Sequence, residues 1–394
     1  MRLRIHDKQN VGCGSCEAPN LRIHQETCHF GYHAAVLAIR LELDLLLVTA
    51  DILRAVNANH GFVTGRWIHF RRGEAIDGNL SGDQRVRRFQ CFQIDVFTSR
   101  RLEGNPLAVF TDARGLTDSE MQDLARETNL QETTFIFPRD AATEREHGVK
   151  VRIFVPNQEI PFGGHPTLGT AMVLRNLHAS QKSRSANGRD VAEITLDLQV
   201  GKIPVVFRTD PSGSLFGEMH QVDPTFGPVH DRESMAALLD LSASDIASDA
   251  PIQTVSTGLF FIIVPMKNLS TLERLTVAPQ KAYDYLKRQN LPSGLADFYY
   301  ITPDTGDSKI GLRSRGIFST GEDPATGSAA GCTAAWMVRY GIIVKPEETV
   351  HILQGAEIKR PSHIFVRATR DGDNIKNVRV GGYAVQIMEG TFSL

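Results

Sequence analysis

The chain has 394 residues, of which 41% are hydrophobic and 22% charged, enough for two or three domains with their own cores. Its 43 basic and 45 acidic residues give a formal net charge of -2, so we expect no nucleic-acid partner. Five cysteines are too few, and odd in number, for a disulfide framework, which indicates a reducing compartment. No secretory signal and no uncharged apolar span is recognisable, so we expect a cytoplasmic protein without membrane contact.

Residues 1–88 differ in texture from the rest of the chain. They hold three of the five cysteines and six of the 13 histidines. Zinc-ligand types gather there, but no second pair completes a site; the candidates are Cys13, Cys16, Cys28, His24, His29 and His33. We interpret residues 1–88 as an atypical, poorly ordered extension or a gene-model artefact, with a metal knuckle as the alternative. Within them, residues 35–56 fit one amphipathic helix and Ile68–Phe70 a short strand.

From Phe89 onward, short strands alternate with short helices. A capping box at Thr117–Glu120 predicts a helix through about Glu127, and a second helix begins at His165. The strands expected here are 89–97, 107–110, 133–137 and 149–155, followed by a hairpin of 192–198 with 203–207. Turn residues at 210–213 then interrupt the pattern, so we predict a first lobe over residues 89–212.

The second lobe, residues 213–394, repeats this pattern. We expect helices at 233–239, at 280–289 and from Asp323 onward. The expected strands are 218–222, 257–264, 298–301, 311–318, 350–353, 363–368 and 383–388. The last strand is free to return to the first lobe. The whole predicts an α+β fold in which a curled sheet wraps around one helix, twice.

Two segments share a pattern that suggests internal duplication. His165–Ala171 and Asp323–Ala329 both read X-Pro-x-x-Gly-(Ser/Thr)-Ala, and each begins a run of small residues. Asp323 suits a helix N-cap and Pro324 a first helical residue. Because helix starts present free N–H groups, both segments suit a carboxylate ligand.

Several polar residues lie at the ends of these elements, and each has an ordinary structural interpretation beside a functional one. Glu132 is either a solvated loop residue or an acid–base group in a cleft. His165 and Asp323 are either helix caps or parts of a site, and Ser328 and Thr170 either pack in the core or help to hold a carboxylate. We interpret Cys332 as a buried thiol and Asn105, between Gly104 and Pro106, as a turn residue.

The sequence lacks the motifs of the common cofactor enzymes. It has no Walker A loop, no G-x-S-x-G nucleophile, no dinucleotide-binding glycine pattern and no metal triad. We therefore expect an enzyme without a cofactor or metal that transfers protons.

Four motifs together resemble the PhzF family of phenazine-biosynthesis-like isomerases. They are Gln93–Phe97 with Gly104–Val109, Asn129–Phe135, Gly163–Gly169 and Glu322–Ala329. The similarity runs from about Arg88 to the C-terminus, and residues 1–88 lie outside it. It implies the diaminopimelate-epimerase-like fold, with two pseudo-symmetric lobes, a cleft between them and a homodimer. The two cysteines of the epimerases have no counterpart here.

The resemblance also implies the role of each site residue. Glu132 would move a proton between two carbons, with His165 and Asp323 positioning the substrate and tuning Glu132. Ser328 and the helix-start N–H groups near Gly164 and Gly327 would hold the substrate carboxylate. We therefore expect an isomerase of a small, cyclic, carboxylate-bearing metabolite, similar to trans-2,3-dihydro-3-hydroxyanthranilate isomerase and in secondary metabolism. The alternatives are an amino-acid epimerase or racemase and a non-catalytic binding protein.

Overall fold

The computed structural model describes residues 60–63, 66–69, 86–182, 193–291, 295–318, 321–342 and 348–394. The chain divides into two compact units, Met1–Gln84 and Arg85–Leu394. Within the first unit, β1 (His60–Val63) and β2 (Arg66–His69) form an antiparallel hairpin, so a strand near Ile68 is confirmed. The predicted helix at 35–56 and the six candidate zinc ligands lie outside the described residues.

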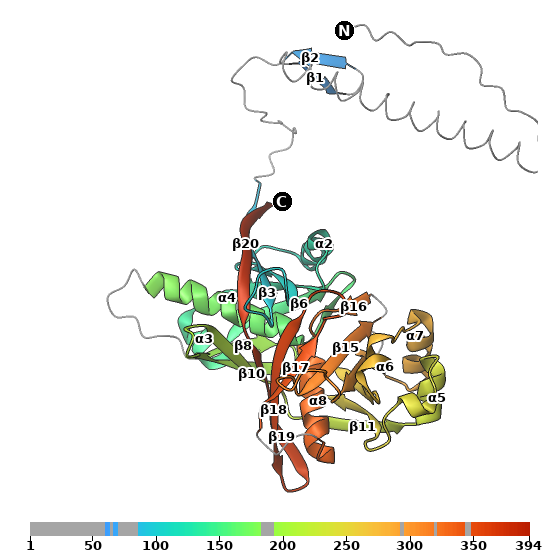
Figure 1. The fold of residues 1–394 in the computed structure, drawn as a ribbon. Helices are drawn as coiled ribbons and strands as arrows, with labels where there is room; N and C mark the ends of the chain where they lie inside the picture. The colour runs from blue at the N-terminus through green and yellow to red at the C-terminus, as the bar shows by residue number, and fades with distance from the viewer. Residues whose placement is uncertain are drawn as a thin grey trace, which may run out of the picture. The chain divides into compact units, whose positions relative to one another are not determined.

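The first half of the second unit follows the predicted alternation closely (Figure 1). The capping box is present, because Thr117 and Glu120 exchange side-chain and backbone hydrogen bonds at the start of α2. The hairpin of β8 with β9 is also confirmed. The elements are β3 (Arg88–Val96), β4 (Asn105–Phe110), α2 (Asp118–Thr128), β5 (Glu132–Phe137), α3 (Ala141–His147), β6 (Val149–Val155), β7 (Gln158–Ile160), α4 (Gly164–Lys182), β8 (Glu193–Leu198), β9 (Gly201–Thr209) and β10 (Leu215–His220).

The second half contains more elements than the sequence patterns predicted. The elements are β11 (Thr225–His230), α5 (Arg232–Leu238), η1 (Ala243–Asp245), β12 (Ile252–Ser256), β13 (Phe260–Pro265), α6 (Leu269–Glu273), α7 (Pro279–Arg288), β14 (Ala296–Thr302), β15 (Leu312–Phe318), β16 (Gly321–Asp323), α8 (Gly327–Tyr340), β17 (Val350–Gln354), β18 (Ser362–Asp371), β19 (Asn374–Gly382) and β20 (Ala384–Ser393). The strand predicted at 257–264 is wrong at its start. A turn around Gly258, whose φ is +128°, separates β12 from β13.

Strand pairing repeats from one half to the other. In the first half, β3–β4 is antiparallel, β4–β5 parallel, β5–β6 antiparallel, β6–β8 parallel and β8–β9 antiparallel. The pairs β12–β13, β13–β14, β14–β15, β15–β17 and β17–β18 follow the same series of orientations. The short strands β7 and β16 pair with β6 and β15 just before α4 and α8. Two pseudo-symmetric lobes are therefore confirmed.

Each lobe wraps its strands around one small-residue helix, α4 or α8 (Figure 1). Residues Gly327 to Val338 of α8 are all buried. Such a helix needs small side chains because sheet residues approach it closely. The lobes are joined where β10 pairs with β19, and β20 returns to pair with β3. The lobe boundary at residue 212 stays a prediction. No helix among the described residues is long and apolar enough to cross a membrane.

The starts of α4 and α8 meet at two glycines. A Cβ atom placed on Gly164 would lie 2.4 Å from the carbonyl carbon of Gly327 and 2.4 Å from the amide nitrogen of Ser328. A Cβ on Gly327 would lie 2.9 Å from Cζ of Phe97 and 3.1 Å from Cα of Gly164. The two backbones therefore touch where a side chain has no space.

One predicted helix boundary is wrong. Asp323 is the last residue of β16 and does not cap α8, which begins at Gly327 with Thr326 in the N-cap position. The chain from Pro324 to Thr326 is a connection, and the Asp323 carboxylate accepts a hydrogen bond from the Thr326 hydroxyl at 2.7 Å. A favourable local capping pattern was overridden because Asp323 pairs with Gly316 in β15.

The glycine contact predicts that Gly164→Ala destabilises the protein. The added Cβ would overlap main-chain atoms of α8, which cannot move away as a flexible side chain could. We expect the free energy of unfolding to fall by at least about 2 kcal/mol in urea denaturation. Gly390→Ala in β20 is the control, because no atom lies within 4 Å of its added Cβ. Equal stability of the two variants would contradict the close contact.

Candidate active site

A cavity of about 600 Å³ lies at the starts of α4 and α8. It is lined by residues from both halves of the second unit. All six residues predicted from the sequence are at this cavity: Glu132, Gly164, His165, Asp323, Gly327 and Ser328. The fold therefore brings together residues that are up to 196 positions apart in the chain, calculated as 328 minus 132.

Glu132 is the first residue of β5, immediately after the end of α2. The chain turns there through Asn129, whose left-handed conformation (φ 50°, ψ 32°) ends the helix. Its Oε2 atom is buried without a hydrogen bond from the described protein, while the side chain as a whole keeps 18% exposure. Burial raises the pKa of this carboxyl well above its usual range, and the nearby charge of Asp323 raises it further.

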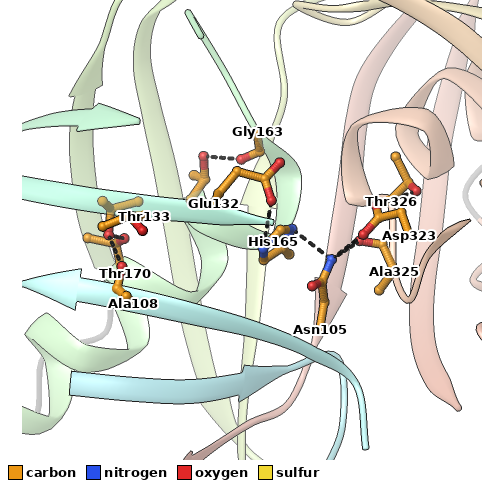
Figure 2. Close-up of polar contacts among 12 residues, drawn as sticks. Asn105, Ala108, Glu132, Thr133, Gly163, His165, Thr170, Asp323, Ala325 and Thr326 are labelled. Carbon is orange, nitrogen blue, oxygen red and sulfur yellow. Dashed lines mark hydrogen bonds and ion pairs between the residues drawn. The ribbon is translucent and has the colours of Figure 1, made fainter. Parts of the chain in front are cut away.

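His165, the second residue of α4, lies directly beside this carboxyl (Figure 2). Its Nε2 atom is 3.2 Å from Oε2 of Glu132. The two atoms are in contact but lack the alignment of a good hydrogen bond. Burial lowers the pKa of His165 to about 3. The imidazole is therefore neutral near pH 7, and the contact is one between a neutral ring and a carboxyl group.

Asn105 connects the two halves of the site, and its interpretation as a turn residue is wrong. It is the first residue of β4 and is fully buried. Its Nδ2 atom lies 3.1 Å from Nδ1 of His165, 2.6 Å from Oδ1 of Asp323 and 2.9 Å from the carbonyl oxygen of Ala325. Figure 2 shows it between His165 and Asp323. The turn ends one residue earlier, at Gly104, whose φ is +71°.

This contact also sets the tautomer of His165. An amide NH₂ group can only donate, so Nδ1 of the ring must accept, and the ring proton is carried by Nε2. That proton is on the side of the ring that contacts Glu132. The amide has two hydrogens for three acceptors, so its hydrogen bonds to His165, Asp323 and Ala325 compete.

Asp323 lies at the other end of this network. Thr326 donates to its Oδ2 atom, and Gln354 donates both to its main-chain carbonyl, at 2.8 Å, and to the Thr326 hydroxyl, at 2.9 Å. Tyr299 in turn donates to Gln354 at 2.8 Å. Burial raises the pKa of Asp323 to about 7, while the hydrogen bonds from Thr326 and Asn105 act in the opposite direction. Of the two carboxyls, Asp323 is therefore the easier to ionise.

Ser328 is the second residue of α8, and its side chain is buried at the cavity. Its hydroxyl makes no hydrogen bond within the described part of the chain. Gly164 and Gly327 bring the first turns of both helices to the same place. The helix starts thus present N–H groups and a hydroxyl at one wall of the cavity, which suits an anionic group.

Two other residues singled out in the sequence belong to the core. Thr170 lies in the second turn of α4 and not in the first, and its hydroxyl is 2.8 Å from that of Thr134. Cys332 is buried against Thr257, and burial raises the pKa of its thiol to about 12. The interpretation of Cys332 as a buried thiol is confirmed, and no cysteine of the described residues lines the cavity.

Sequence reasoning missed three residues that line the cavity or hold its network. Gln354 and Asn105 act through contacts between residues far apart in the chain, so no local pattern marks them. Asp297 lines the cavity from β14. A signal for it was present, because an acid next to the apolar run Phe298–Ile301 is unusual in a buried strand.

The two lobes, their central helices and the cavity at the helix starts define the diaminopimelate-epimerase-like class of fold. Solved structures agree with this assignment. A phenazine biosynthesis protein of the PhzF family from Bacillus anthracis is 27% identical, with a TM-score of 0.65, covering 78% of this chain and 99% of that one. A hydroxyproline epimerase from Agrobacterium vitis shares the fold, with a TM-score of 0.52 at 14% identity, covering 78% of this chain and 93% of that one.

The family follows from the sequence comparisons. The model of the phenazine biosynthesis-like proteins (PhzC-PhzF) matches residues 94–390. A trans-2,3-dihydro-3-hydroxyanthranilate isomerase from Pseudomonas fluorescens is 33% identical over 303 residues, covering 76% of this chain and 98% of its own. The same enzyme from Pseudomonas aeruginosa is 30% identical over 297 residues, covering 75% and 96%. The chain therefore belongs to the PhzF family and is an isomerase.

The lowered pKa of His165 predicts a pH-dependent stability. Between about pH 3 and pH 6.5 the unfolded state binds a proton that the folded state does not, so folding stability falls as pH falls through this window. The slope from this group is at most about 1.4 kcal/mol per pH unit. His165→Gln removes it, so the stability difference between wild type and variant should shrink toward low pH in urea denaturation.

The exposed His147 provides the control for that measurement. His147→Gln should leave the pH dependence of stability like that of the wild type. A stability difference between wild type and His165→Gln that stays constant from pH 7 to pH 4 would show that His165 titrates normally.

Proposed function

We propose that this isomerase moves a proton within a small, cyclic, carboxylate-bearing metabolite and that Glu132 both removes and returns the proton. The observation that carries the proposal is the Glu132 carboxyl at the cavity, 3.2 Å from a neutral imidazole. No lysine or arginine among the described residues pairs with it. Such a carboxyl is a stronger base than a solvated one when ionised, and a proton donor near neutral pH when protonated.

The surrounding groups suit one proton being exchanged within a closed site. Ionised Asp323 raises the pKa of Glu132, so the pair favours one proton shared between two carboxyls, held chiefly by Glu132. The Nε2–H of His165 faces Glu132 and is suited to hold the ionised carboxylate, or a polar group of the substrate, in place. A single carboxyl that takes and returns the same proton ends each cycle in its starting state, without net proton uptake.

The carboxylate of the substrate is proposed to bind at the helix starts. Ser328 and the N–H groups near Gly164 and Gly327 supply donors, and the helix dipoles favour a negative charge there. This arrangement would leave the ring of the substrate toward Glu132. The relatives named trans-2,3-dihydro-3-hydroxyanthranilate isomerase make that compound the first substrate to assay.

The family resemblance extends the proposal to the setting of the enzyme. We include a homodimer, a cytoplasmic location, catalysis without a cofactor and a pathway of secondary metabolism. Light scattering on the purified protein tests the dimer, and dialysis against a chelator before the assay tests whether activity is independent of a metal.

A second candidate function is epimerisation of an amino acid, which needs two acid–base groups on opposite faces of the substrate. The observation that favours it is the second buried carboxyl, Asp323, whose pKa is raised to about 7. An epimerase would incorporate solvent deuterium at an inverted carbon, whereas the proposed isomerase moves the proton to another carbon and changes the position of a double bond.

The proton shuttle predicts a large loss of turnover in Glu132→Gln. The amide keeps the shape of the side chain but can neither accept nor donate the proton, so kcat should fall at least about 100-fold. Steady-state assays with trans-2,3-dihydro-3-hydroxyanthranilate measure this loss. Glu127→Gln, an exposed position near the end of α2, is the control and should retain wild-type kcat. A kcat of Glu132→Gln within about twofold of wild type sinks the proposal.

Ser328→Ala separates substrate binding from proton transfer. Loss of one hydrogen bond to a charged carboxylate costs roughly 1.5–3 kcal/mol, so KM should rise by about tenfold or more. The kcat value should change little, because Ser328 does not take part in the transfer. Ser393→Ala, on an exposed part of β20, should change neither constant. An unchanged KM in Ser328→Ala would remove Ser328 from the carboxylate site.

A further inference from the structure

Part of the cavity wall comes from β13, β14 and their neighbouring loops. Apolar side chains dominate this part; they are Leu259, Phe260, Phe261, Leu295, Ala296 and Phe318. Asp297, in the second position of β14, lies among them. The proposed proton transfer does not use this carboxyl.

The strand geometry aims Asp297 at the cavity. Its neighbour Phe298 is fully buried in a core cluster with Tyr300, packed against residues of α5 and α7. Because consecutive side chains of a strand point to opposite faces, Asp297 faces away from that core. One of its oxygens accepts a hydrogen bond from the amide of Phe298 at 2.9 Å. The other receives none from the described protein.

No cation compensates this carboxyl. Among the described residues, no lysine, arginine or histidine forms an ion pair with Asp297. Arg360 also lines the cavity, but it is bound to Asp95 and to the carbonyl oxygens of Glu103 and Gly104, each at 2.8 Å. The pKa of Asp297 is raised to about 8, mainly by burial and further by the charge of Asp323. A buried carboxyl without a counter-charge costs stability, so its presence calls for a partner that binds later.

We propose that Asp297 is a specificity-determining residue that binds an amino group of the substrate, so that the substrate is a cyclic amino acid. This inference rests on the proposed function, because it assumes that the substrate carboxylate binds at the starts of α4 and α8. The two sites would then recognise the two charged groups of one molecule. An ammonium group supplies the missing positive charge and a donor for the free oxygen, and its binding lowers the pKa of Asp297.

The apolar surroundings make this recognition selective. A substrate without the amine would leave Asp297 unpaired in the closed site, and a buried unpaired polar group carries a large penalty. The preference therefore arises from rejection of amine-free compounds as well as from attraction of amines.

Two stable probes that differ only in the amine test the inference. They are cis-2-aminocyclohexanecarboxylate and cyclohexanecarboxylate, with affinities measured by calorimetry on the full chain. We choose about pH 8.5, where an alkylammonium is still protonated. Wild type should bind the amino acid at least about tenfold more tightly, as expected for a charge-assisted hydrogen bond.

Asp297→Asn is the decisive variant, because an asparagine can still accept the hydrogen bond from Phe298 but carries no charge. It should bind both probes equally within about twofold, with its affinity for cyclohexanecarboxylate no weaker than that of wild type. Asp373→Asn, in an exposed turn between β18 and β19, should keep the wild-type preference. A preference that survives in Asp297→Asn, no preference in wild type, or no binding of either probe would each overturn the inference.

Failure of this inference and failure of the proposed function give different results. If the preference for the amine depends on Asp297 but Glu132→Gln turns over like wild type, the proton shuttle is wrong and the amine site stands. If Glu132→Gln is inactive but Asp297→Asn keeps the preference, only the amine site is wrong.

Discussion

The contact between Gly164 and Gly327 is the constraint on which the rest of the structure depends. Each glycine lies at the start of the central helix of one lobe, and neither position has space for a Cβ atom. Because the helices meet there, the loops and strand ends that precede them also meet. Glu132 from β5, Asn105 from β4 and Asp323 from β16 become neighbours as a consequence. The site is thus built where the two halves of a duplicated pattern touch.

Burial then sets the electrostatics of the site. The same loss of solvent raises the pKa values of Glu132 and Asp323 and lowers that of His165, so near neutral pH the groups avoid charge. Asn105 fixes which nitrogen of His165 carries the proton and at the same time donates to Asp323. Its fully buried position in β4 makes it a positioning residue that connects the first lobe to the second.

Local patterns in the sequence were sufficient for the strands, the capping box and the pairing of the two helix starts. They succeeded because alternation, caps and small-residue runs act over a few residues. They failed where a contact between distant residues decides the outcome. Asn105 follows a glycine and precedes a proline, which is typical of a turn, yet strand pairing with β3 places it in the core. Asp323 had a favourable capping sequence, but pairing with β15 places it one connection before the helix. Asp297 shows its importance only through the cavity that both lobes form.

The fate of a labelled hydrogen tests the central claim, that one water-shielded carboxyl carries the proton from carbon to carbon. The substrate is trans-2,3-dihydro-3-hydroxyanthranilate deuterated at the two saturated ring carbons, allowed to react in ordinary water and analysed by mass spectrometry and NMR. Direct transfer through Glu132 predicts that some product molecules carry the abstracted deuterium at the new position. Complete loss of that deuterium to water, at the earliest measurable turnover, would contradict the account.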